Sequence, residues 1–252
     1  MRITVLSSTV QALKYQFLPS YLINDTVVID AGSIGFAELG VQKKVQSVFL
    51  SHSHLDHVAS LPIFLDNVYQ PSPECPTVYA SQAVIDALKM HFLNDTLWPD
   101  VDALGRERTP FVRIIPIKDS EPVQTEGLTV TPVLLNHCVP TFGFIVDDGT
   151  SAVALVSDTA PTIAIWQLVQ TNPRIKAVFL ECAFPNNMAW LAKEAMHLTP
   201  SLFREELVKI GRHLPVVAMH IKPAFYDAVV SELRDLELKS LRIGQPNDTF
   251  VY

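Results

Sequence analysis

Short apolar runs rich in β-branched residues recur along the chain, and each is bounded by proline, glycine, aspartate or serine, as β-strands are. We predict strands over residues 3–6, 26–29, 45–50, 77–79, 112–117, 128–135, 142–146, 152–156, 177–180 and 216–219. Between them, apolar residues at helical spacing predict helices over residues 58–69, 81–93, 161–169, 200–210 and 223–236. Three of these begin with proline, whose missing N–H costs little in a first helical turn.

The strands follow one another in runs and do not alternate strictly with helices. That order favours an α+β fold with sheets packed on each other and helices outside, and it disfavours a doubly wound nucleotide-binding fold. Gly32 and Gly35 form GxxG, which is not the GxGxxG of dinucleotide binding. The polar, irregular segment 98–110 is either a surface excursion or a loop over a site. Without repeats or Gly/Ser linkers, we expect one domain over residues 1–252.

Composition narrows the class of protein. Of 252 residues, 48% are hydrophobic and 18% charged, which supports a core without disulfides and excludes disordered or collagen-like chains. No apolar run approaches the ~18–20 residues of a spanning helix, and the start shows no signal peptide, so we expect a cytoplasmic protein. The net charge of −7 makes long nucleic acids poor partners. The three widely spaced cysteines indicate reduced thiols, of which Cys138 or Cys182 could line a site.

Three histidines and an aspartate stand within six residues directly after the strand 45–50, as His52-x-His54-x-Asp56-His57. A strand-to-helix turn points such side chains at a common point, and imidazole and carboxylate groups suit zinc, iron or manganese. A lone core histidine is usually only hydrogen-bonded, but a chance HxHxDH match is rare in a chain with eight histidines. The motif therefore predicts a metal site.

Further ligands should follow other strands, because a metal site draws its ligands from several elements. His137, Asp158 and His220 each stand within two residues of the end of a predicted strand. Any one of them alone is as easily a polar residue that ends a strand. Together with HxHxDH, they predict one metal centre.

The chain resembles the metallo-β-lactamase-fold hydrolases over nearly its whole length. The resemblance lies in the order of Asp30-Ala31-Gly32 after the second strand, HxHxDH, His137, Asp158 and His220. The resemblance implies a four-layer αββα sandwich with two metal ions at one edge of the sheets. It implies that one ion is held by His52, His54 and His137, the other by Asp56, His57 and His220, and that Asp158 bridges them. We expect zinc, with manganese or iron as alternatives for the same ligand set.

Three stretches are similar to the class II cyclic-nucleotide phosphodiesterases: residues 52–61, residues 137–145, and residues 181–186 followed by His197-Leu198-Thr199-Pro200. The third is the most informative, because lactamases and glyoxalases have no such histidine, whereas phosphodiesterase members, including tRNA 3′-end nucleases, have one. The chain departs from the family pattern in two places. Leu6-Ser7-Ser8-Thr9 replaces a Gly-rich opening, and Ser60 stands where glycine is common.

The resemblance implies hydrolysis of cAMP or cGMP to the 5′-monophosphate by a hydroxide shared between two cations ~3.5–4 Å apart. A proton donor for the leaving oxygen adds roughly 10²–10⁴-fold. His197 is our candidate donor, or else a capping residue before the helix 200–210. Glu181 either orients His197 or forms a salt bridge. Asp56 completes the predicted catalytic set, and Asp30 either braces a ligand histidine or is a turn residue.

Alternative functions share this metal core, namely a tRNA 3′-processing endoribonuclease and a hydrolase of another small phosphodiester. The nuclease needs a basic arm to grip tRNA, and the net charge of −7 opposes it. A binding module without turnover would have lost a ligand, yet all seven positions are filled. Phe142, Phe144 and Trp98 could stack on a purine, although strand aromatics more often belong to a core. We expect an enzyme for a small cyclic nucleotide, not a membrane partner, and a homodimer as in many family members.

Overall fold

The computed structural model describes residues 1–9 and 14–252, which form two seven-stranded mixed sheets. The first sheet holds β1 (Arg2–Val5), β2 (Tyr21–Ile23), β3 (Val27–Ile29), β4 (Ser47–Phe49), β5 (Thr77–Ala80) and β6 (Arg113–Pro116), with β14 (Thr249–Val251) beside β1. The second holds β7 (Val123–Thr125), β8 (Leu128–Leu134), β9 (Phe142–Asp147), β10 (Ala152–Val156), β11 (Ile175–Glu181), β12 (Val216–Met219) and β13 (Leu241–Ile243). Strands β3 to β6 and β10 to β13 pair in parallel.

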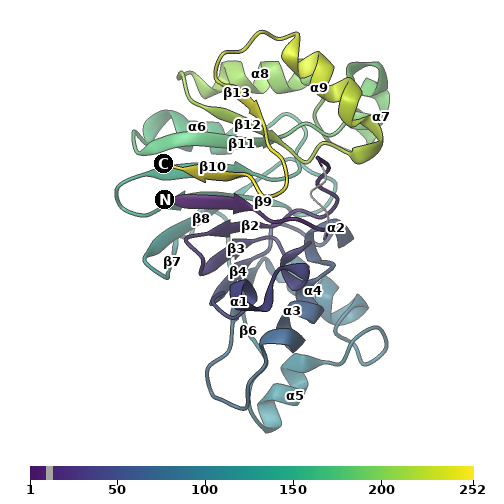
Figure 1. The fold of residues 1–252 in the computed structure, drawn as a ribbon, viewed down its shortest axis with the longest axis vertical. Coiled ribbons are helices and arrows are strands. Elements are labelled where there is room, and N and C mark those ends of the chain that lie inside the picture. Colours follow the sequence, from purple (N-terminus) through teal and green to yellow (C-terminus); the bar gives the residue numbers. More distant parts are fainter. Residues whose placement is uncertain (10–13) are drawn as a thin grey trace.

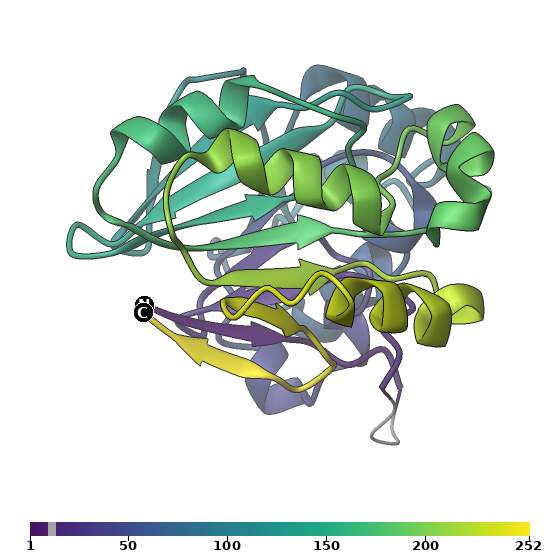
Figure 2. The same ribbon diagram turned by 90° about the horizontal axis from the view of Figure 1, so that it is seen from above.

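Helices cover the outer face of each sheet, so the molecule has the layers helix, sheet, sheet, helix (Figure 1). The first sheet is covered by α1 (Leu39–Gln42), α2 (Leu55–Val58), α3 (Leu61–Val68), α4 (Gln82–His91) and α5 (Val101–Glu107). The second half of the chain supplies α6 (Ala164–Thr171), α7 (Ala189–Glu194), α8 (Pro200–Ile210) and α9 (Tyr226–Arg234), seen from above in Figure 2. Short 3-10 turns are η1 (Ile34–Phe36), η2 (Asn186–Met188) and η3 (Pro223–Phe225). The predicted αββα sandwich is confirmed.

Three apolar clusters hold these layers together. The middle cluster joins the inner faces of both sheets and includes Phe49 from β4 and Phe144 from β9. The outer clusters lie between each sheet and its helices. Phe142 and Phe144 are buried in the middle cluster, and Trp98 packs on the cluster beneath the helices of the first sheet. The structure therefore supports a core role for these aromatic side chains.

The observed elements differ from the predicted ones mainly where they are short. Strands β2, β7, β13 and β14, of three residues each, were not predicted, whereas β3 and β4 are as short but lie in apolar runs that were predicted as strands. The predicted helix 58–69 is divided, with Ser60 between α2 and α3. The expectation of an irregular segment over 98–110 was wrong, since Asp100 accepts a hydrogen bond from Ala103 N (2.9 Å) and caps α5. No helix within the described ranges is long and apolar enough to cross a bilayer.

The strands that lead to the predicted site all end at one edge of the sandwich. Strand β8 is antiparallel to β9, and β9 to β10, so β8 runs in the direction of β10, β11 and β12. The chain termini lie at the opposite edge from α2 (Figure 1). Because carboxyl ends of parallel strands meet at one edge of a sheet, side chains that follow β3, β4, β8, β10 and β12 can converge there.

Candidate metal centre

The HxHxDH turn is held against the end of β3 by a close backbone approach. A Cβ atom on Gly32 would lie 2.1 Å from the carbonyl oxygen of Asp56 and 2.6 Å from that of Pro19, so only glycine fits. Next to it, Ala31 N donates to the carbonyl of His57 over 2.7 Å. These contacts explain why Asp30-Ala31-Gly32 accompanies HxHxDH in the sequence.

Ser60, which replaces a common glycine, strengthens the same turn. Its fully buried hydroxyl donates to the carbonyl oxygen of Ala31 (2.8 Å) and accepts from Gly35 N (2.9 Å). At the other departure from the family pattern, the Ser7 hydroxyl donates to the carbonyl oxygen of Thr9 over 2.8 Å. Both departures are thus accommodated by hydroxyl hydrogen bonds that glycine cannot make.

All seven predicted ligands are brought together in two clusters. In each cluster the donor atoms lie within 4.8 Å of one another; one cluster is His52, His54, His137 and Asp158, and the other is Asp56, His57 and His220. The sequence separation of these residues shows that convergence of strand ends, and not the local motif alone, builds the site.

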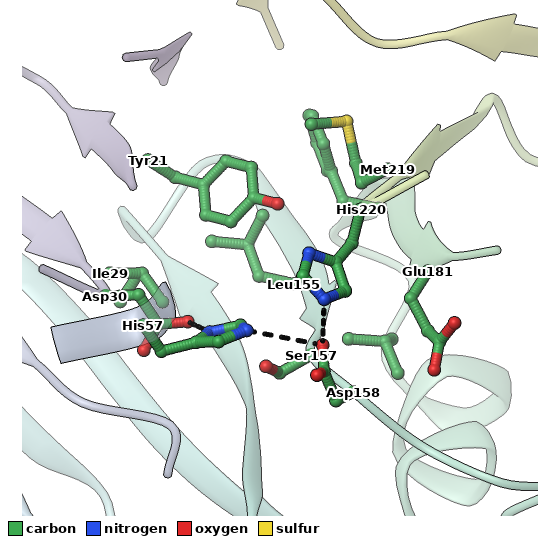
Figure 3. A pocket seen from close by; sticks show the side chains of 12 residues that line it. Tyr21, Ile29, Asp30, His57, Leu155, Ser157, Asp158, Glu181, Met219 and His220 are labelled. Carbon is green, nitrogen blue, oxygen red and sulfur yellow. Dashed lines mark hydrogen bonds and ion pairs between the residues drawn. The ribbon is translucent and has the colours of Figure 1, made fainter. Parts of the chain in front are cut away.

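Asp158 lies between the clusters and offers one oxygen to each. Its Oδ2 is 3.6 Å from His52 Nε2 and 4.0 Å from His137 Nε2. Its Oδ1 is 3.4 Å from His57 Nε2 and 3.3 Å from His220 Nε2. Figure 3 shows the imidazoles of His57 and His220 pointing at this carboxylate. This is the arrangement expected of a carboxylate that bridges two cations.

Three of these atoms are buried and have no hydrogen-bond partner among the residues that the structure describes: His52 Nε2, His57 Nε2 and Asp158 Oδ1. Burying an unsatisfied polar atom costs about 1–3 kcal/mol, and more when the group is charged. Nitrogen and oxygen donors aimed at common points are the ligands of divalent first-row metals. The donor set therefore fits two divalent ions.

The ring nitrogens that face away from the clusters are held by outer partners. His57 Nδ1 lies 2.7 Å from Asp30 Oδ2, and the Asp30 carboxylate also accepts from Ser51 N (2.8 Å) and Ser51 Oγ (2.9 Å). His137 Nδ1 lies 3.0 Å from the carbonyl oxygen of Met196. Such partners set the tautomer that leaves Nε2 free to bind a metal. Asp30 braces a histidine, which is the first of the two roles considered for it.

His197 and Glu181 form a buried pair beside the clusters. His197 Nδ1 lies 2.7 Å from Glu181 Oε1, and the same carboxylate accepts from Thr159 N and Ala183 N at 3.0 Å each. His197 Nε2 is 3.9 Å from Asp158 Oδ2. The cap of α8 is Thr199, whose hydroxyl accepts from the backbone, so His197 is not the capping residue. The Glu181 carboxylate thus holds His197 with Nε2 facing the donor clusters.

Opposing effects of burial and charge set the pKa values of the site. Burial by itself would lower the pKa of His57, but the carboxylates of Asp158 and Asp30 raise it well above its ordinary value. At His197, burial would lower the pKa, but the Glu181 carboxylate raises it. The net pKa of His197 is raised. For Asp158, burial would raise the pKa, but His220 and His57 hold it well below its ordinary value. His197 therefore keeps a proton more readily than an ordinary histidine.

A small pocket of about 20 Å³ lies between the sheets behind the clusters (Figure 3). Its apolar wall includes Leu155, Phe179 and Met219, and Tyr21 projects into it. Burial and the nearby carboxylate of Asp30 raise the pKa of Tyr21, so its hydroxyl stays protonated. An apolar wall lowers the local dielectric and strengthens the interaction of charges at the clusters.

Two further side chains reach the clusters without having been predicted as ligands. Lys222 Nζ lies 3.1 Å from Asp56 Oδ2 and 3.0 Å from His220 Nε2. Of the two cysteines considered, Cys138 lines the site, with Sγ 3.6 Å from His137 Nε2, whereas Cys182 is buried in an outer core. The only sequence signal for Lys222 is its position two residues after His220.

Comparison with known proteins points to one family. The model for class-II cAMP phosphodiesterases matches residues 8–145, more than half of the chain, including HxHxDH and His137. A probable 3′,5′-cyclic-nucleotide phosphodiesterase from Yersinia pestis is 28% identical over an alignment of 227 residues that covers 81% of this chain and 64% of that protein. The chain thus matches somewhat less than two thirds of that relative's length.

Solved structures support the fold. Unliganded yeast PDE1 has a TM-score of 0.81 at 18% identity, covering 100% of this chain and 99% of that one. The metallo-β-lactamase fold protein YhfI from Bacillus subtilis has a TM-score of 0.76 at 16% identity, covering 99% and 98%. The metallo-β-lactamase fold implied by the sequence is therefore confirmed over the whole chain.

Proposed function

The chain belongs to the class-II cAMP phosphodiesterase family, and we propose that it hydrolyses 3′,5′-cyclic nucleotides, cAMP or cGMP, to 5′-monophosphates. The observation that carries the proposal is the position of Asp158, whose two oxygens face separate clusters of donors at 3.3–4.0 Å. One carboxylate shared in this way suits a pair of ions acting on one phosphoryl group. The homodimer, the single domain and the cytoplasmic location stay predictions.

The ligands divide between two ions as the sequence implied. His52, His54 and His137 would hold the first, Asp56, His57 and His220 the second, with one oxygen of Asp158 for each. When bound, two divalent ions, of which zinc is our first choice before manganese or iron, would activate water as the nucleophile and neutralise phosphoryl charge. The outer partners Asp30 and Met196 keep the ligand rings in the required orientation.

His197 is the proposed proton donor. Formation of a 5′-monophosphate breaks the bond between phosphorus and O3′, so O3′ leaves and must gain a proton. Glu181 holds His197 Nδ1, which leaves Nε2 directed at the side of the site where Asp158 Oδ2 lies. The Glu181 carboxylate raises the pKa of His197 and so favours the protonated ring that a proton donor needs. Glu181 is a positioning residue in this scheme.

A panel of substrates tests the proposal. Purified protein loaded with Mn²⁺ or Zn²⁺ is offered cAMP, cGMP, bis(p-nitrophenyl) phosphate and precursor tRNA in parallel, and the products are separated by chromatography. We expect 5′-AMP or 5′-GMP and no 3′-monophosphate. His54→Ala, prepared identically, should abolish turnover and thereby exclude a contaminating enzyme, while the exposed His213→Ala should match the wild type. Cleavage of tRNA alone would contradict the proposal.

A further inference from the structure

Lys222 places a cation directly against the second ligand cluster. Its ammonium contacts Asp56 Oδ2 at 3.1 Å and His220 Nε2 at 3.0 Å, and its side chain is 31% exposed. The residue lies between β12 and η3, where its backbone N donates to the carbonyl oxygen of Ala183 over 3.3 Å. The backbone is therefore anchored while the long side chain keeps access to the solvent at the site.

The contact with His220 conflicts with metal binding. A lysine ammonium has only donors, so His220 Nε2 must accept this hydrogen bond with its single lone pair. The same lone pair is the one that His220 would offer to a divalent ion, because imidazole binds metals through an unprotonated nitrogen. Lys222 would therefore compete with an ion in the second cluster for one electron pair, and its ammonium would leave His220 when an ion is held there.

The displaced ammonium has a limited range of positions. Asp56 is a neighbour of Lys222 that can keep one contact, and repulsion by a bound cation drives Nζ toward the exposed side of the cluster. A phosphodiester has anionic, non-bridging oxygens, and a substrate must reach the clusters from their solvent-exposed side. Lysine is a common point-charge partner of phosphate groups.

We infer that Lys222 is a substrate-binding residue: its ammonium competes with an ion for the acceptors of the second cluster, and beside a bound ion it would contact a non-bridging phosphoryl oxygen. The inference rests on the proposed function for the identity of the anion. If the charge of Lys222 is removed, the second ion should bind more tightly and the substrate should bind more weakly.

Ion affinity and KM are both measured in Lys222→Gln. Lys222→Arg retains the charge, and Lys176→Gln, at an exposed lysine of β11, is the matched control. Calorimetric titration of metal-free protein with Mn²⁺ should show second-ion affinity increased about threefold to tenfold in Lys222→Gln, because its competitor is gone. Steady-state kinetics of the loaded enzyme should show KM for cAMP increased about tenfold, with a smaller change in kcat. Lys222→Arg should keep KM near the wild-type value.

Unchanged second-ion affinity in Lys222→Gln, or an unchanged KM, overturns the inference. A wild-type protein that hydrolyses bis(p-nitrophenyl) phosphate but no cyclic nucleotide would contradict the proposed function instead. In that event the ion titration and the KM for bis(p-nitrophenyl) phosphate still decide the role of Lys222.

Discussion

Two histidines of the site, His57 and His197, are braced alike but face different surroundings. Each places Nδ1 2.7 Å from a buried carboxylate, that of Asp30 or that of Glu181. In both, burial would lower the pKa and neighbouring carboxylates raise it. The braces therefore fix the same tautomer, and the carboxylates around each ring shift its pKa in the same direction.

The difference lies at the free nitrogen. His57 Nε2 is buried without a hydrogen-bond partner in the described part of the chain and is 3.4 Å from Asp158 Oδ1, inside a ligand cluster. His197 Nε2 is 3.9 Å from Asp158 Oδ2, and His197 belongs to neither cluster. Its side chain is 7% exposed, against 2% for His57. The roles that we propose for the two histidines therefore follow from what each Nε2 atom faces. The buried carboxylate at Nδ1 is common to both and does not distinguish them.

The largest effect should come from removing the carboxylate that both histidines face. We expect Asp158→Asn to lower bound metal from two ions toward none, and to reduce kcat by well over the ~10–100-fold typical of losing an outer partner. Metal analysis by mass spectrometry and steady-state kinetics measure this. Asp235→Asn, at an exposed aspartate, is the control. A fully loaded Asp158→Asn protein would mean that Asp158 is not a ligand.

Replacing His57 and His197 one at a time tests whether the two histidines have different roles. His57→Ala should lose metal, melt at a lower temperature and lose activity together, because binding free energy of the ion adds to folding stability. His197→Ala should retain the metal and its melting temperature while kcat falls roughly 10²–10⁴-fold. The paired readouts are metal content and kcat of each variant. Metal loss in His197→Ala would place both histidines among the ligands.

The smallest effects should come from the braces. Asp30→Asn should weaken ion binding by ~10–100-fold, as loss of an outer-shell carboxylate does. Glu181→Gln should instead change the pH profile of kcat. The acid form of His197 is lost as pH rises through its pKa; Glu181 raises that pKa, so its removal moves the alkaline limb to lower pH.

A merely structural role for Glu181 would lower kcat at every pH without moving the limb. The pH–rate profile of wild type and Glu181→Gln, measured with the same metal content, separates these outcomes. A limb that stays in place would contradict the role of Glu181 in raising the pKa of His197.

The sequence by itself determined the local chemistry of the site. HxHxDH is a contiguous motif after a strand, so its ligand chemistry is readable without a fold, whereas the close backbone approach at Gly32 became visible only in the structure. His137, Asp158 and His220 were predicted because each follows a predicted apolar strand and a metal site draws its ligands from several elements. The family resemblance then supplied the layered fold.

The tertiary structure alone decided which groups meet. Asp56 and Lys222 are 166 positions apart, and nothing in either local sequence predicts their contact. The division of the two Asp158 oxygens between the clusters, and the location of Cys138 at the site while Cys182 lies in a core, depend on packing of the two sheets. Three-residue strands such as β2 likewise owe their existence to burial between neighbours and carry no periodic signal of their own. Local patterns encode which chemistry is available, whereas distances between remote side chains are set only when the core packs.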